Sequence, residues 1–221
     1  MGTGTGTGTR IGVMGGTFDP IHNGHLVAAS EVAARLQLDQ VVFVPTATPN
    51  FKQAAQVTSD EHRYVMVELA TASNPLFTVS RVDIDRGGVT YTVDTLRDLR
   101  AQESVQLPEG RRGGAGESQW FFITGADAIA HIHRWKNCDE LWDLATFVAV
   151  TRPGHTLDVT HTLDVAGVPQ GSVIPVEIPA LDISSTTCRQ RIASGMPVRY
   201  LMPELVERYI SKHGIYGRSA G

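Results

Sequence analysis

Short apolar runs rich in β-branched residues alternate along this chain with longer stretches whose apolar positions recur at helical spacing. The short runs predict strands at Ile11–Met14, Val41–Pro45, Phe77–Val82, Trp120–Thr124, Phe147–Thr151 and Val173–Ile178. The longer stretches predict helices at Gly24–Leu36, Asp60–Ser73, Val93–Ala101, Ala126–His131 with Cys138–Leu144, Thr187–Ser194 and Glu204–His213. Strands that alternate with helices are typical of parallel sheets. We therefore expect an α/β protein, a doubly wound parallel sheet with covering helices in a single domain.

Four segments fall outside this alternation. Residues 1–9 alternate glycine and threonine and are expected to form a disordered tail, with residues 218–221 as a second short tail. Residues 102–118 contain several glycines and two adjacent arginines, which predicts a mobile surface insertion. Residues 154–171 lack sustained periodicity and predict a loop. The folded domain is therefore expected to span residues 10–217.

Composition narrows the class of protein. With 221 residues, 42% hydrophobic and 19% charged, the chain resembles an ordinary soluble globular protein with one full core. A net charge of -4 argues against binding to nucleic acid or to a membrane surface, which usually needs a basic stripe. No apolar run approaches the roughly 18 residues of a membrane-spanning helix. Cys138 and Cys188 form no CxxC pattern, so reduced thiols and a cytoplasmic location are expected.

The most informative stretch is Gly15-Gly16-Thr17-Phe18-Asp19-Pro20-Ile21-His22-Asn23-Gly24-His25, between the first predicted strand and the first predicted helix. Adjacent glycines let the backbone approach a ligand where a Cβ would collide. His22 and His25 can share one face of the first helical turn, whose N–H groups and dipole favour an anion. A capping or packing role is the alternative for each imidazole. The combination predicts a phosphate site in a protein that handles a nucleotide.

A second stretch, Ile183-Ser184-Ser185-Thr186-Thr187-Cys188-Arg189, places hydroxyl side chains just before a predicted helix. Such residues are preferred N-caps, and they present hydroxyls and backbone N–H groups together. Arg189 lies about one turn inside the helix, where its guanidinium can reach phosphate oxygens held at the helix start. By itself the run is better explained as an ordinary helix cap with a solvated surface arginine.

Together these two stretches resemble the nucleotidyltransferase superfamily with the HxGH signature. Within it, the chain is most similar to the bacterial nicotinate-mononucleotide adenylyltransferases. Weaker matches lie between the two stretches: His62-Arg63-Tyr64-Val65-Met66, Thr90-Tyr91-Thr92-Val93-Asp94-Thr95-Leu96, Gly125-Ala126-Asp127, Trp135 and Arg152-Pro153-Gly154. The resemblance runs from about Arg10 to Tyr216 and implies a Rossmann-like fold.

The resemblance implies roles for particular residues. The catalytic group would be His22, His25 and Arg189. ATP would be bound by Gly15, Gly16, Thr17, Phe18, Lys52, Gly125, Asp127, Ile183, Ser184, Ser185 and Thr186. The mononucleotide would be bound by Thr90, Tyr91, Thr92, Trp135 and Arg152. An indole or phenol face suits the flat, cationic pyridine ring, although core packing explains Tyr91 and Trp135 about as well.

The implied reaction is adenylyl transfer from ATP to nicotinate mononucleotide, giving nicotinate adenine dinucleotide and pyrophosphate, a step of NAD biosynthesis. Mg²⁺ is expected to arrive with ATP, and no metal site held by the protein is expected, because His131 and His133 lack a third ligand. The resemblance allows a homo-oligomer. The alternatives are another adenylyltransferase, with nicotinamide mononucleotide or phosphopantetheine as acceptor, and a nucleotide sensor without catalysis.

Overall fold

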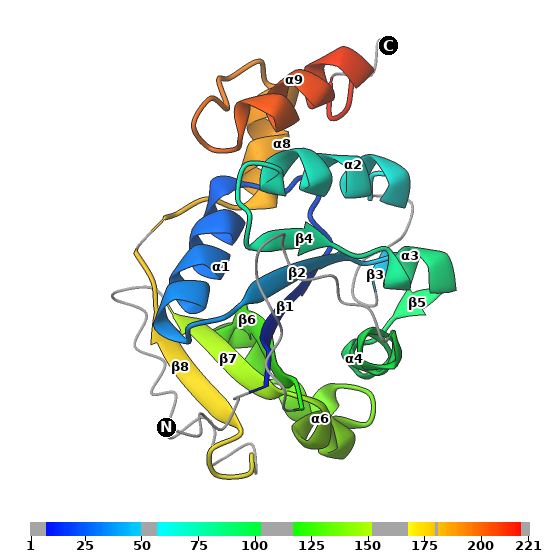
Figure 1. Ribbon diagram of the computed structural model, residues 1–221. Helices are drawn as coiled ribbons and strands as arrows, with labels where there is room; N and C mark the ends of the chain where they lie inside the picture. Colours follow the sequence, from blue (N-terminus) through cyan, green and yellow to red (C-terminus); the bar gives the residue numbers. More distant parts are fainter. Residues whose placement is uncertain (1–7, 50–56, 103–116, 152–167, 180, 218–221) are drawn as a thin grey trace.

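The computed structural model describes residues 8–49, 57–102, 117–151, 168–179 and 181–217, which form a central parallel sheet with helices on both faces (Figure 1). The sheet has six strands in the order β4-β2-β1-β6-β7-β8, and every neighbouring pair is parallel. The strands are β1 (Arg10–Gly16), β2 (Gln40–Pro45), β4 (Phe77–Val79), β6 (Gln119–Gly125), β7 (Thr146–Thr151) and β8 (Val173–Glu177). All six predicted strands are present.

The strand order explains where a ligand would bind. The chain starts in the centre with β1, adds β2 and β4 on one side, and then crosses over to add β6, β7 and β8 on the other. Val13 in β1 lies opposite Val42 in β2 and Phe122 in β6. The strand order therefore reverses between β1 and β6, and open α/β sheets bind ligands beyond the carboxyl ends of the strands at such a point. The predicted doubly wound, Rossmann-like sheet is confirmed.

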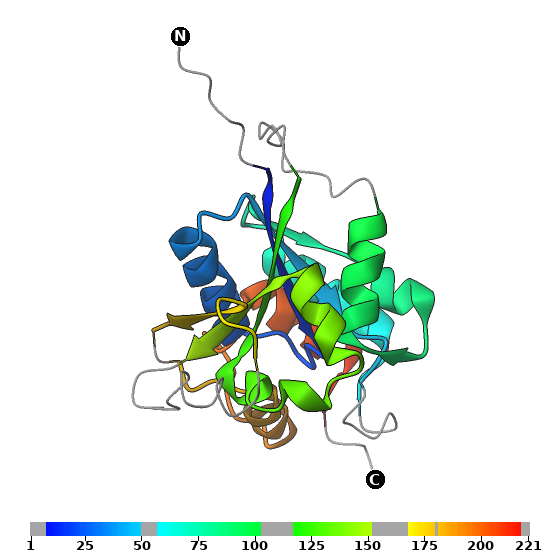
Figure 2. The ribbon, with the colours of Figure 1, turned by 90° about the horizontal axis from the view of Figure 1, so that it is seen from below.

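Two apolar layers hold the helices to the sheet, and Figure 2 shows these helices on either side of it. One layer packs side chains of α1 (Asn23–Arg35), α2 (Asp60–Thr71), α8 (Ser185–Ala193) and α9 (Glu204–His213) against one face. The other packs α3 (Val82–Arg86), α4 (Thr92–Ala101), α5 (Ala126–Ile129), η2 (Ile132–Arg134) and α6 (Cys138–Leu144) against the opposite face. Val41 and Phe43 point to the first layer and Val42 and Val44 to the second, as strand alternation requires.

The predicted strand over Phe77–Val82 is too long. Pairing of β4 ends at Val79, the backbone N–H of Ser80 donates to the carbonyl of Phe43 at 2.9 Å, and Val82 instead begins α3. Val82 is buried in this short helix, and an isolated apolar residue does not distinguish a strand end from a helix start. The two-stranded sheet of β3 (Thr48–Pro49) and β5 (Val89–Thr90) was not predicted either, because two residues show no periodicity.

The remaining helices follow the predictions within a few residues. The predicted helix Ala126–His131 ends at Ile129, with the separate turn η2 after it, and α8 starts two residues before the predicted Thr187. Ser184 is the N-cap of α8 and accepts a hydrogen bond from the backbone N–H of Thr187 at 3.1 Å. The predicted tails at 1–9 and 218–221, the insertion 102–118 and the loop 154–171 lie wholly or largely outside the described residues.

Candidate active site

A cavity of about 530 Å³ opens at the carboxyl ends of β1, β6 and β7, between the N-terminal ends of α1 and α8. It lies where the strand order reverses, the position that the fold makes available to a ligand. Ten residues predicted to bind ATP or to act in catalysis line this cavity: Gly15, Gly16, Phe18, His22, His25, Gly125, Asp127, Ile183, Ser184 and Ser185. The two stretches that carry the resemblance therefore meet at one cavity, although more than 150 residues separate them in sequence.

His22 and His25 stack face to face at the start of α1. Their ring centroids are 3.7 Å apart, with an angle of 25° between the ring planes. His22 is the N-cap of the helix, and its backbone N–H donates to Nδ1 of His25 at 3.2 Å. Because Nδ1 of His25 accepts this hydrogen bond, the proton of the neutral ring is on Nε2, which becomes a donor. The imidazole pair thus combines N–H donors with the positive end of a helix.

Gly24 makes this imidazole arrangement feasible. A Cβ at Gly24 would lie 3.0 Å from Nδ1 and 3.1 Å from Cε1 of His22, closer than most real Cβ contacts. The glycine between the two histidines therefore leaves space for the ring of His22 against the first turn of α1.

We expect Gly24→Ala to lower kcat about tenfold, because a displaced catalytic group loses much of its effect. Alanine favours helix over glycine by up to about 1 kcal/mol, so the melting temperature should stay equal or rise. Steady-state kinetics and thermal melting of the same preparation measure the two effects. Ser30→Ala, at an exposed position of the same helix, is the control. An unchanged kcat in Gly24→Ala would contradict the role assigned to this glycine.

The loop after β1 is fixed in a conformation that needs Gly16. Phe18 has a positive φ of 49° and is 2% exposed, and its ring lies against the backbone of Gly16. A Cβ at Gly16 would lie 2.9 Å from Cζ of Phe18. The ring of Phe18 also meets the ring of His25 edge-on, with centroids 5.1 Å apart. Gly16 thus provides space for the phenyl ring that supports His25, in addition to the access to a ligand expected from the sequence.

Arg189 joins α8 to the loop after β1. Its Nη1 donates to the backbone carbonyl of Asp19 at 2.7 Å and lies 3.8 Å from a carboxylate oxygen of the same residue. Its Nη2 lies 3.4 Å from the hydroxyl oxygen of Thr186. A further bond connects the two segments, because the hydroxyl of Ser185 donates to the carbonyl of Pro20 at 2.9 Å. These contacts confirm that the two stretches converge, as the sequence predicted.

Arg63 is the residue of this region whose importance the sequence did not reveal. It is 1% exposed, and its guanidinium donates to the carbonyls of Thr58, Thr17 and Ala47, each at 2.8 Å. Burial lowers the pKa of Arg63, and the negative charge of Asp19 opposes that effect. One buried cation therefore ties the loop after β1 to the loop after β2 and to the start of α2. The match at His62–Met66 marked the residue but gave no role for it.

Tyr91 and Trp135, both predicted to bind the mononucleotide, pack against the apolar layer on the face of the sheet opposite α1 and α8. Trp135 is half-buried, with its ring centroid 6.2 Å from that of Phe122 and 6.1 Å from that of Phe147. The ring of Phe122 in turn lies against Gly15, since a Cβ at Gly15 would be 3.4 Å from Cζ of Phe122. Thr90 accepts a hydrogen bond from the backbone N–H of Ala47 at 3.1 Å. Tyr91, Thr92 and Trp135 do not line the 530 Å³ cavity, so their contact with substrate stays a prediction.

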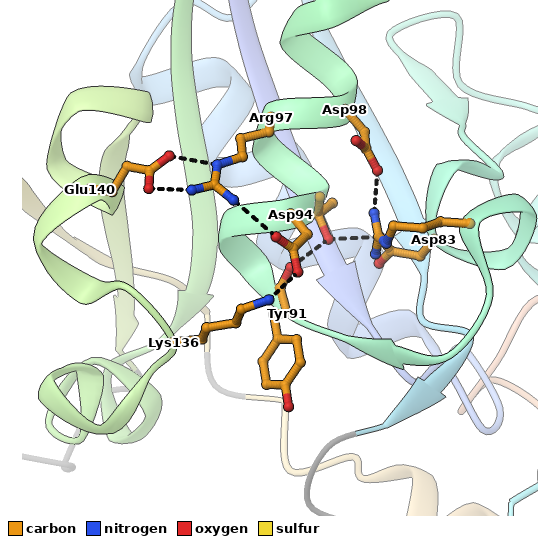
Figure 3. A network of polar contacts seen from close by, with 9 residues as sticks. Asp83, Tyr91, Asp94, Arg97, Asp98, Lys136 and Glu140 are labelled. Carbon is orange, nitrogen blue, oxygen red and sulfur yellow. Dashed lines mark hydrogen bonds and ion pairs between the residues drawn. The ribbon is translucent and has the colours of Figure 1, made fainter.

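A polar network surrounds Tyr91 (Figure 3). Nζ of Lys136 lies 4.5 Å from the centroid of the Tyr91 ring and 2.9 Å from a carboxylate oxygen of Asp94. Arg97 connects Asp94, at 3.2 Å, to Glu140, at 2.6 Å. This network fixes the first turn of α4 against the segment that carries Trp135. Asp94, in the first turn of α4, pairs with Lys136 and Arg97 through its side chain and makes no hydrogen bond that caps the helix.

Two predicted ligands, Lys52 and Arg152, lie outside the described residues. Thr17, Thr186 and the predicted catalytic residue Arg189 do not line the cavity, so the contact of Arg189 with a ligand stays a prediction. His131 and His133 have ring centroids 6.4 Å apart, and within the described ranges no three His, Cys, Asp or Glu side chains are placed to hold a metal ion.

Comparison with known proteins decides the family. Residues 13–191 match a family model described as cytidylyltransferase-like. The probable nicotinate-nucleotide adenylyltransferase of Clavibacter michiganensis is 59% identical over 207 residues, which cover 94% of each chain. The protein of the same name from Acidothermus cellulolyticus is 55% identical over 217 residues, covering 98% of this chain and 99% of the relative. This chain belongs to the nicotinate-nucleotide adenylyltransferase family.

Solved structures agree with that assignment at the level of the fold. The Plasmodium falciparum nicotinic acid mononucleotide adenylyltransferase complexed with NaAD superimposes with a TM-score of 0.71 at 19% identity, over 94% of this chain and 97% of that one. A putative nicotinate-nucleotide adenylyltransferase from Vibrio parahaemolyticus gives a TM-score of 0.64 at 13% identity. The fold of this chain is thus found again in solved structures at low sequence identity.

Proposed function

We propose that this chain transfers the adenylyl group of ATP to nicotinate mononucleotide, giving nicotinate adenine dinucleotide and pyrophosphate in NAD biosynthesis. The observation that carries the proposal is the meeting of the stacked His22 and His25 with the start of α8 at one cavity. That geometry belongs to a chain 55–59% identical to proteins named for this reaction. The cavity residues and the family assignment point to the same chemistry.

The reaction places two anions against each other. A phosphate oxygen of the mononucleotide attacks the α-phosphorus of ATP and forms a new P–O bond. The bond between the α-phosphorus and the oxygen that bridges it to the β-phosphorus breaks. Because the nucleophile is already an anion at neutral pH, no general base is needed. The site must instead align the groups and neutralise the charge that develops on the α-phosphoryl oxygens. We assign that task to the imidazole N–H groups of His22 and His25 together with the N-terminal end of α1.

The departing pyrophosphate carries away the electron pair of the broken bond and needs cations and N–H donors of its own. Arg189 and the backbone of Ser184, Ser185 and Thr186 at the start of α8 are proposed to hold it, with Lys52 as a further cation. Mg²⁺ is proposed to enter as the complex with ATP, with the phosphates and water as its main ligands.

Two further expectations stay predictions. No helix among the described residues is long and apolar enough to cross a membrane. We propose a cytoplasmic location and, as the family resemblance allows, a homo-oligomer.

Pyrophosphate release with a series of acceptors tests the proposed function. The purified protein is given ATP with nicotinate mononucleotide, nicotinamide mononucleotide or phosphopantetheine, and the series is repeated with CTP. We expect the highest kcat/KM with ATP and nicotinate mononucleotide. A higher value with another acceptor would assign a different member of the superfamily. Binding of ATP without pyrophosphate release with any acceptor would make the chain a sensor.

Trp135→Ala is expected to raise KM for nicotinate mononucleotide about tenfold, because a stacked or cation–π contact contributes about 1–2 kcal/mol. KM for ATP should change much less. Steady-state kinetics with each substrate varied in turn make the comparison.

Trp142→Ala is the matched control for that variant. Trp142 packs on the same Phe147, with ring centroids 5.3 Å apart, but lines a different cavity with Arg10 at the opposite edge of the sheet. It should lower stability without changing KM for the mononucleotide. The same KM for nicotinate mononucleotide in Trp135→Ala and Trp142→Ala would assign Trp135 to core packing alone.

A further inference from the structure

Tyr216 follows the last helix of the chain and reaches the loop after β1. Its hydroxyl donates to Oδ1 of Asp19 at 2.6 Å. Asp19 is 2% exposed, so this carboxylate has almost no access to water. Burial, together with the acceptor carboxylate, raises the pKa of Tyr216, and its hydroxyl therefore remains a protonated donor in the ordinary pH range. The sequence assigned no role to Tyr216 or to Asp19.

The other carboxylate oxygen of Asp19 faces Arg189. The distance from Oδ2 to Nη1 is 3.8 Å, longer than a hydrogen-bonded ion pair, whereas the same Nη1 donates to the backbone carbonyl of Asp19 at 2.7 Å. Arg189 is thus attached to this residue mainly through the neutral carbonyl. Its guanidinium stays about one third exposed, with a relative side-chain accessibility of 30%.

A buried carboxylate needs partners for both oxygens. Tyr216 supplies one for Oδ1, and the positive charges of Arg189 and the buried Arg63 act on the carboxylate as well. Without the tyrosine hydroxyl, the carboxylate would form a closer ion pair with Arg189. Such an ion pair would compete with a phosphate oxygen for the same N–H groups.

We propose that Asp19 and Tyr216 are positioning residues that hold Arg189 in the orientation in which it binds pyrophosphate. Tyr216 occupies one oxygen of Asp19, and the remaining attraction keeps Arg189 over the loop after β1 without a tight ion pair. The proposal extends the function proposed above, because it rests on Arg189 as a pyrophosphate ligand. It also gives the segment after α9 a direct connection to the site.

Calorimetric titration with magnesium pyrophosphate tests this without an acceptor substrate. We expect Tyr216→Phe to raise Kd about tenfold, the size of effect typical of a hydrogen bond to a charged group. In an Arg189→Ala background, Tyr216→Phe should change Kd less than about twofold, since Tyr216 acts through Arg189. Asp19→Asn keeps an acceptor for the tyrosine but removes the charge, so it should likewise raise Kd about tenfold in the wild type and less than about twofold in the Arg189→Ala background.

The control is Tyr209→Phe, which removes a different hydroxyl of the C-terminal region, 2.8 Å from Nδ1 of His62. It should leave Kd for pyrophosphate unchanged. Should Tyr216→Phe not fold, Asp19→Asn carries the test.

The proposal would be overturned if Tyr216→Phe changed Kd for pyrophosphate by the same factor in both backgrounds, or left it unchanged in the wild type. A wild-type protein that does not bind pyrophosphate would overturn it as well. The outcome is distinguishable from failure of the proposed function. That failure would appear as absent turnover of nicotinate mononucleotide, whereas the binding cycle would still report on the three side chains.

Discussion

Replacing His22 by alanine is expected to lower kcat about 100- to 1000-fold and to change KM for ATP much less. His22 is 5% exposed and stacked on His25 at the start of α1, so its ring is held in place before substrate arrives. A donor fixed in this way stabilises the charge of the transition state more than that of the bound substrate. Steady-state kinetics with ATP varied at saturating mononucleotide separate the two constants.

His133→Ala is the matched control for this variant. His133 is exposed, and it lies in η2 away from the cavity, so its removal should leave kcat within about twofold of the wild type. A His22→Ala enzyme with unchanged kcat would remove His22 from catalysis. A rise in KM for ATP with kcat unchanged would limit it to binding the ground state.

Arg63→Met is expected to lower the free energy of unfolding by about 3 kcal/mol. Methionine fills much of the same volume but donates no hydrogen bond, so the carbonyls of Thr58, Thr17 and Ala47 lose their donor. Part of the loss is offset, because the buried guanidinium no longer has to be removed from water. Urea unfolding followed by circular dichroism gives the value.

Arg35→Met controls for the loss of an arginine as such. Arg35 is in the last turn of α1, its side chain is 51% exposed, and it pairs with Glu31 at 3.8 Å. An exposed pair of this kind contributes about 0.5 kcal/mol or less. A loss below about 1 kcal/mol in Arg63→Met would contradict the role of Arg63 as the joint between the three segments.

The sheet was predictable because its strands carry their own signal. Buried strands such as Val41–Pro45 are continuous apolar runs, and the helices between them are long enough to show a helical period. The doubly wound parallel arrangement followed from the general behaviour of alternating strands and helices, whereas the order of the strands was not predicted. What lacked such a signal was missed: the two residues of β3, the two of β5, and the single turn of α3 that begins at Val82.

The site was predictable to the extent that its residues adjoin strand ends or helix starts. Gly15, Gly16, His22, His25 and Ser184 belong to two local stretches, and parallel strands bring such stretches to one edge of the sheet. The contacts of Arg63, Asp19 and Tyr216 could not be found in this way. Arg63 donates to carbonyls up to 46 positions away and Tyr216 donates to Asp19 across 197 positions, and no local pattern records such contacts. The ligand contacts of Lys52, Arg152 and Trp135 stay predictions.

The most direct test of the central claim follows the α-phosphorus of ATP. The purified protein is incubated with nicotinate mononucleotide and ATP radioactively labelled at either the α- or the γ-phosphorus, and the products are separated by chromatography. The account predicts that the α-label appears in nicotinate adenine dinucleotide and the γ-label in pyrophosphate, and that His22→Ala suppresses both. A wild-type protein that forms no α-labelled dinucleotide, or that releases the γ-label as inorganic phosphate, would contradict it.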